Sequence, residues 1–136
     1  MDYVKSFKSL EVYKLPRGLS KEIFEISKKF PREELFSLTD QIRRSSRSVG
    51  AQIAEAWARR KYEKHFVSKL TDADGEQLET QHWIEVASDC GYLSKETAEN
   101  VLQHCASIGR MLNSMMAKAP TFCNPANADN RLPNQD

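Results

Sequence analysis

Apolar residues recur along this chain at intervals of three and four, the spacing of one face of an amphipathic α-helix. The first run is Leu19, Ile23, Ile26 and Phe30. The same stripe continues upstream at Phe7, Leu10 and Tyr13. Pro16 and Gly18 are expected to kink this helix or to delay its regular part. Because Pro31 disfavours helical geometry at Phe30, the pattern predicts that the helix ends there.

The next run predicts a second helix, with Glu33 and Glu34 suited to its positive end. Its stripe is Leu38, Ile42, Ser45, Val49, Ile53 and Ala56. Its small side chains, which allow a neighbouring backbone to approach, are Ser45, Ser48, Ala51 and Ala54. Gly50 is a weak point within it, because glycine costs roughly 1 kcal/mol relative to alanine in a helix.

Two further helices are predicted beyond residue 60. The third runs from about Tyr62 to Cys90, with Gly91 as its stop. Its apolar face is Phe66, Leu70, Ala73, Ile84 and Ala87. Ser94 is placed to cap the fourth helix. The stripe of that helix is Val101, Cys105, Ile108, Leu112 and Met115.

Short turns between long amphipathic helices favour antiparallel neighbours. The predicted fold is therefore all-α, an up-down-up-down four-helix bundle that covers residues 1–118. No alternation of the kind found in β-strands competes with it. Residues 119–136, rich in Pro, Asn and Ala with little to bury, are predicted to form a disordered tail.

Length and composition are those of an ordinary soluble domain, with 136 residues and 40% hydrophobic residues. No apolar run approaches the ~20 residues that a membrane span needs, and the N-terminal residues do not resemble a signal peptide. A cytoplasmic location is expected. Cys90, Cys105 and Cys123 are odd in number and share no metal-binding spacing, so reduced thiols are expected.

The net charge of +1 conceals a segregation of charge along the chain. Residues 43–64 hold seven basic residues against two acidic ones, whereas residues 72–99 hold eight acidic residues against Lys95 alone. The basic residues, which are the candidate nucleic-acid contacts, are Arg43, Arg44, Arg47, Arg59, Arg60, Lys61 and Lys64. Arginines beside serine hydroxyls on one sector of a helix are suited to holding phosphates.

The basic cluster is also compatible with a merely solvated surface and with two pairing arrangements that involve no nucleic acid. Arg44 can pair within its own helix, with Asp40 one turn before it or with Glu55 on the same face. Alternatively, the basic segment meets the acidic third helix of a neighbouring subunit, which favours head-to-tail contacts that close into a ring.

Signals for catalysis or metal binding are weak. Glu79 and His82 have the i, i+3 spacing of di-iron bundles, but a second such pair is missing. Asp72 and Asp74 resemble the start of a calcium loop whose later ligands are absent. No nucleophile motif and no glycine-rich phosphate loop is found. We therefore expect no enzymatic activity, metal or cofactor.

The segment FPREELFSLTDQIRRSSRSVGAQIAEAWARR, with FKSLEVYK before it, resembles the four-helix-bundle proteins encoded in intervening sequences of bacterial 23S ribosomal RNA genes. The matching residues of this block are Phe7, Leu10, Phe30, Pro31, Glu34, Leu38, Gln41, Arg43, Arg44, Ser48, Ile53, Ala54 and Glu55. Later matches are Leu78, Glu79, Gly91, Tyr92 and Leu93. The resemblance covers about residues 5–117. Departures from the family pattern are Pro16, Gly50, Gln52 and Ala56.

The same fold occurs in the accessory proteins of diversity-generating retroelements. That resemblance implies a homopentameric ring that works with a reverse transcriptase and with RNA or DNA. The preferred hypothesis is a non-enzymatic scaffold that presents arginines to nucleic acid. The alternative is a protein-interaction adaptor whose arginines are used in subunit contacts and which has no affinity for nucleic acid.

Overall fold

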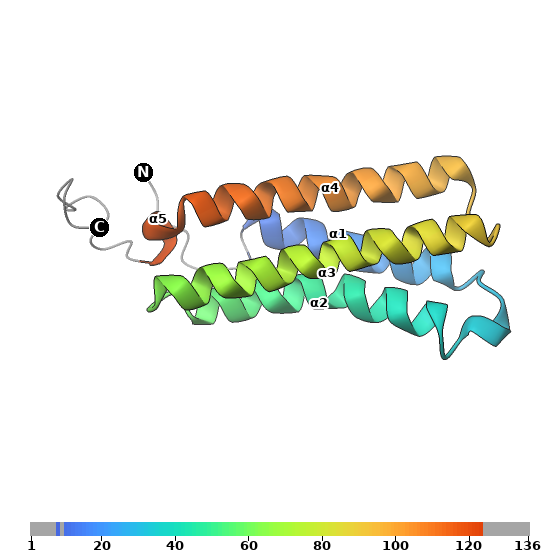
Figure 1. The fold of residues 1–136 in the computed structure, drawn as a ribbon, viewed down its shortest axis with the longest axis horizontal. Helices are drawn as coiled ribbons and strands as arrows, with labels where there is room; N and C mark the ends of the chain where they lie inside the picture. The colour runs from blue at the N-terminus through green and yellow to red at the C-terminus, as the bar shows by residue number, and fades with distance from the viewer. Residues whose placement is uncertain (1–7, 9, 124–136) are drawn as a thin grey trace.

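The computed structural model describes residues 8 and 10–123 (Figure 1). Within these residues all regular structure is helical, and no strand is present. The elements are α1 (Glu11–Ser27), a 3₁₀ turn (Arg32–Glu34), α2 (Leu38–Ala58), α3 (Glu63–Asp89), α4 (Lys95–Ala117) and α5 (Ala119–Cys123). None of the described helices is long and apolar enough to cross a membrane.

The four long helices lie side by side, and each runs opposite to the one before it (Figure 1). Contacts join α1 to α2, α2 to α3, α3 to α4, and α4 back to α1. The predicted helical bundle and its up-down-up-down order are confirmed. The α1–α2 and α3–α4 connections share one end of the bundle, while the α2–α3 turn and α5 share the other (Figure 1).

The core is built from the apolar stripes that the sequence indicated. Side chains with no exposed surface include Ile23, Ile42, Val49, Ile53, Phe66, Leu70, Ile84, Val101, Ile108 and Leu112. Each buried side chain of this size contributes roughly 1.5–3 kcal/mol by its removal from water. The stripes of all four helices therefore meet along the bundle axis.

Local signals fix the start of α4 and the end of α3. Ser94 caps α4, since its Oγ accepts a hydrogen bond from the Thr97 N–H at 3.1 Å. Gly91 follows α3 with a φ of 77°, a left-handed conformation that glycine adopts without strain. Pro16 neither delays nor ends α1, which begins five residues before it. Glu33 and Glu34 lie in the 3₁₀ turn and not in the first turn of α2.

The prediction of a disordered tail from Ala119 is wrong for its first five residues, which form α5. Proline is tolerated in the first turn of a helix, where Pro120 lies. The Phe122 ring packs 6.1 Å from Phe66 and 6.3 Å from Trp57, centre to centre. These aromatic contacts give α5 a core to pack on. The rest of the expected tail, residues 124–136, lies outside the described residues.

Two glycines are expected to respond to alanine in opposite ways. In Gly50→Ala the new Cβ would meet Pro16 and Tyr13 at 3.7 Å, an ordinary contact, so the better helix former should raise the unfolding free energy by roughly 0.5–1 kcal/mol. Gly91→Ala should lower it by about 1–2 kcal/mol, because a side chain is strained at that φ. Urea unfolding measures both, and a destabilised Gly50→Ala would contradict the packing described for α1 and α2.

Candidate functional site

The arginines of the first half of α2 line one shallow depression of about 540 Å³. Its lining residues are Leu35, Phe36, Asp40, Arg43, Arg44 and Arg47. The guanidinium groups nevertheless have different partners. Arg43 donates a hydrogen bond from Nε to Ser27 Oγ at 2.8 Å and lies 4.6 Å from the centre of the Phe24 ring. Arg47 approaches the same ring at 5.5 Å. Both arginines thereby join α2 to α1 through cation–π contacts.

Arg44 turns to α3 instead. Its guanidinium pairs with Glu79 and lies 3.5 Å from Glu76 Oε2. That Glu76 oxygen is buried and has no hydrogen-bond partner among the described residues, so Arg44 supplies its neutralising charge. The predicted pairing of Arg44 within its own helix, with Asp40 or Glu55, is therefore wrong, because its partner carboxylates belong to α3 of the same chain.

Glu79 and His82, the candidate metal ligands, have other contacts. Glu79 accepts a hydrogen bond from Trp83 Nε1 at 3.1 Å in addition to its pair with Arg44. The His82 ring lies against the Trp83 ring, with centres 4.8 Å apart. In the described part of the chain, no three His, Cys, Asp or Glu residues are grouped so that they could hold a metal ion.

The remaining predicted cations lie at the α2–α3 turn, at the opposite end of the bundle (Figure 1). Arg59 lies twelve positions after Arg47, which corresponds to about 18 Å along the helix. The single basic surface predicted from the sequence is thus two clusters. In residues 8 and 10–123, no carboxylate pairs with Arg59, Lys61 or Lys64. All three are exposed.

Aromatic side chains accompany the cations of this turn. The guanidinium of Arg60 lies 3.8 Å from the centre of the Trp57 ring, and its Nε donates to the Trp57 carbonyl at 2.9 Å. Burial lowers the pKa of Arg60. Tyr62 is 57% exposed, and the Lys61 ammonium lies 5.9 Å from its ring centre. Tyr62 was not among the predicted nucleic-acid contacts, although an aromatic residue within a basic run is itself a signal for nucleic-acid binding.

A second exposed aromatic residue was also missed. Phe36 is 91% exposed at the corner between the 3₁₀ turn and α2. The corner is anchored by Glu34, which accepts hydrogen bonds from Ser37 Oγ at 2.6 Å and from Tyr92 Oη at 2.9 Å. These bonds lower the pKa of Glu34, and the bond to Glu34 is the main reason that the pKa of Tyr92 is raised to about 12. Phe36 lies outside the apolar stripe, which is the signal that it is not a core residue.

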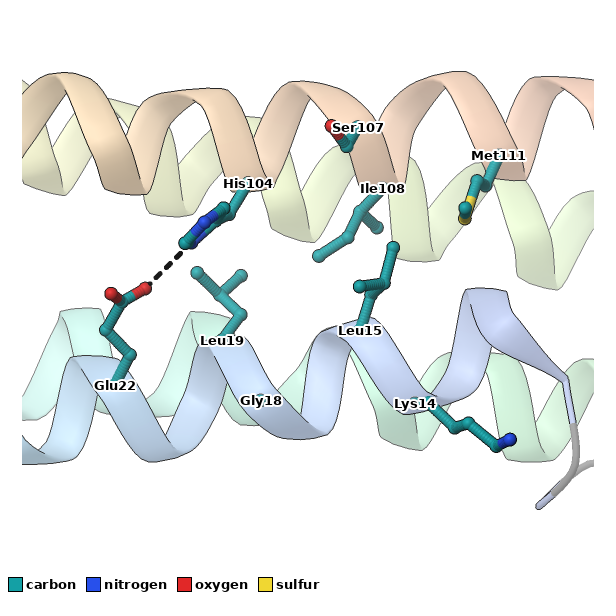
Figure 2. Close-up of a pocket in the computed structure, with 9 residues that line it drawn as sticks. All are labelled: Lys14, Leu15, Gly18, Leu19, Glu22, His104, Ser107, Ile108 and Met111. Carbon is teal, nitrogen blue, oxygen red and sulfur yellow. Dashed lines mark hydrogen bonds and ion pairs between the residues drawn. The ribbon is translucent and has the colours of Figure 1, made fainter.

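A cleft of about 470 Å³ lies between α1 and α4. Leu15, Leu19 and Ile108 point into it, and His104 Nδ1 and Glu22 Oε1 bridge the helices 2.9 Å apart at one end (Figure 2). The neighbouring Cys105 has a pKa raised to about 12, mainly by burial and secondly by the charge of Glu22. Its thiol therefore stays protonated at neutral pH and is unsuited to act as a nucleophile.

Residues 8–114 match the family of 23S rRNA-intervening sequence proteins. The chain belongs to this family. A crystal structure of a protein of unknown function, assigned to the S23 ribosomal protein family of Bacteroides thetaiotaomicron, is similar, with a TM-score of 0.70 and 28% sequence identity. The similarity covers 77% of this chain and 97% of that one. No curated protein matches the chain. The family resemblance inferred from the Phe30–Arg60 segment is confirmed at this level.

Arg44→Gln is expected to lower the unfolding free energy by about 1–3 kcal/mol, because it leaves the buried Glu76 oxygen without its counter-charge. Arg47→Gln is the matched control on the same helix, and it removes only a cation–π contact of roughly 0.5–1 kcal/mol. Urea unfolding measures both values. Equal losses for the two variants would argue against a structural role specific to Arg44.

Proposed function

We propose that this chain is a cytoplasmic, non-enzymatic scaffold, assembled as a homopentameric ring, that binds RNA or DNA through the basic α2–α3 turn. The expected resemblance to the accessory proteins of diversity-generating retroelements is the ground on which a reverse transcriptase is proposed as the enzyme that it serves. The observation that carries the proposal is the group of exposed cations at this turn that have no carboxylate partner among the described residues. The electrostatic attraction of such cations to phosphate is the largest part of sequence-independent nucleic-acid binding.

The arginines of α2 and the cations of the α2–α3 turn are proposed to have different roles. Arg44 pairs with carboxylates of α3, and Arg43 and Arg47 pack on Phe24 of α1, so each of these arginines has a partner within the chain although Arg44 and Arg47 are exposed. An arginine that turns to a phosphate must give up such a contact, whereas Arg59, Lys61 and Lys64 have no carboxylate partner among the described residues to give up. The cations of the turn are therefore the better phosphate ligands, and the α2 arginines are secondary ones.

Charges at the end of the bundle opposite the α2–α3 turn support the proposed homopentameric ring. The exposed or half-buried cations near the α1–α2 connection, which outnumber the exposed carboxylates Glu33 and Asp40 there, are Lys29, Arg32, Arg43 and Arg47. Exposed carboxylates near the α3–α4 connection are Glu85, Asp89, Glu96 and Glu99. Different patches that attract one another form a head-to-tail contact, and such a contact closes into a ring when its rotation fits. Phe36 lies on the basic side, where its exposed ring provides apolar surface for the contact.

The alternative function, an adaptor without nucleic-acid affinity, is favoured by a separate observation. Arg44 forms internal ion pairs with Glu76 and Glu79, and a largely exposed phenylalanine is typical of protein interfaces. In this alternative the α2–α3 turn is a contact for an acidic protein partner. Direct binding measurements on the purified protein separate the two functions.

The combined variant Arg59→Gln, Lys61→Gln, Lys64→Gln should lose most of its affinity for RNA and DNA while keeping its oligomeric state. The salt dependence of binding, measured by fluorescence anisotropy, should become shallower by roughly 0.7–0.9 in log–log slope for each phosphate contact removed. The control variant removes three exposed cations elsewhere, Lys21→Gln, Lys95→Gln and Arg110→Gln. Equal weakening by both sets would show that net charge, and not the turn, drives binding.

Phe36→Ser should dissociate the ring at micromolar concentration without unfolding the chain, because the side chain that it removes contacts solvent in the single subunit. Leu78→Ser is the matched control, since Leu78 is 54% exposed on α3 and away from the charged end. Light scattering after gel filtration should give about five times the 15.6 kDa chain mass for the wild type and the control. A wild-type protein that elutes as a single chain would overturn the ring.

A further inference from the structure

The α2–α3 turn combines phosphate-binding charge with an exposed flat ring. Arg59, Lys61 and Lys64 surround Tyr62 in the sequence, and each of the four side chains is exposed. We propose that the turn binds single-stranded nucleic acid in preference to duplex, with one base stacked on Tyr62 and the neighbouring phosphates on the three cations. This inference rests on the proposed nucleic-acid function and names its substrate class and the residue that selects it.

The backbone around Tyr62 is fixed, so the ring is presented in a defined place. The Tyr62 N–H donates to the Arg59 carbonyl at 3.0 Å, and the Tyr62 carbonyl accepts from the Phe66 N–H at 3.0 Å. The residue precedes the first residue of α3. A ring held by ordered backbone loses little conformational freedom when a base stacks on it, which favours binding.

The surroundings of the ring also suit a base. The His65 ring lies on one side at 5.4 Å between centres, and the Lys61 ammonium lies 5.9 Å from the Tyr62 centre. Arg60 adds a second flat group, because its guanidinium is held over Trp57. Aromatic rings and guanidinium planes are the surfaces on which unpaired bases stack. Tyr62 lies outside the apolar core of the described residues, so packing in the core does not account for an aromatic residue here.

The preference for single strands follows from the accessibility of base faces. In a duplex each base face is covered by its neighbour, and only the phosphates are available to this turn. In a single strand an unstacked base offers its face to Tyr62 while the adjacent phosphates still reach the cations. Stacking on an aromatic side chain contributes about 1–3 kcal/mol per base, so even one base separates the two substrates by about fivefold or more.

The test uses the full-length protein, a labelled single-stranded oligonucleotide as DNA and as RNA, and the duplex of the same sequence. Tyr62→Ala should lower the affinity for single strands by at least about fivefold, the lower end of the stacking contribution. Tyr62→Phe keeps the ring and should bind like the wild type. Duplex affinity should be the same in all three proteins, and thermal unfolding should confirm that each is folded.

The outcomes distinguish this inference from the function on which it rests. Binding of single strand and duplex with equal affinity, unaffected by Tyr62→Ala, would overturn the stacking role and leave nucleic-acid binding intact. Equal weakening of both substrates by Tyr62→Ala would also overturn it, because it would show a loss of general turn structure. A wild-type protein that binds neither substrate at low salt would overturn the proposed function itself and identify the turn as a contact for protein.

Discussion

The contact between α2 and α3 determines where the charged side chains of this bundle lie. It is the most extensive contact between helices in the described chain. Short polar side chains in this contact allow the two helices to approach closely. Ser45 and Thr80 are fully buried, with their hydroxyl oxygens 2.9 Å apart. Because these hydroxyls satisfy one another, the helices can approach without an unpaired polar group in the core. The register that results places Arg44 opposite Glu76 and Glu79.

That register separates two kinds of cation. Arg44 neutralises a buried carboxylate oxygen, and removing such a partner costs more than breaking an exposed ion pair, typically about 1–3 kcal/mol against less than about 1 kcal/mol. At the α2–α3 turn, Arg59, Lys61 and Lys64 are exposed to solvent, so removing one of these cations has no comparable cost in stability. A chain with a net charge of +1 can therefore still present a strongly basic surface at one end.

Sequence patterns predicted the four long helices because each depends on neighbours in the sequence: an apolar stripe, a Ser94 cap, a Gly91 stop. The partner of Arg44 was not predictable, since spacing within α2 suggests only residues of α2, whereas the packing of two helices decides which carboxylate is near. Helix α5 was not predicted because five residues are too few to show a helical period. Phe122 can be recognised as a packed residue only from its contacts with Phe66 and Trp57, which the sequence does not show. The basic segment divides into two clusters because α2 holds its cations far apart in space. A count of charges along the sequence contains no such distance.

The length of α2 also separates the surface proposed for assembly from the surface proposed for binding. Its 21 residues span about 30 Å, with Phe36 before one end and Tyr62 beyond the other. Substitutions this far apart act independently unless a shared structural change links them, so the two surfaces can be altered one at a time. In the proposed ring, rotational symmetry places every α2–α3 turn at the same height and at the same distance from the axis. A single strand that follows this circle would meet several turns in succession, so weak stacking at each copy would add up to firm binding through effective concentration.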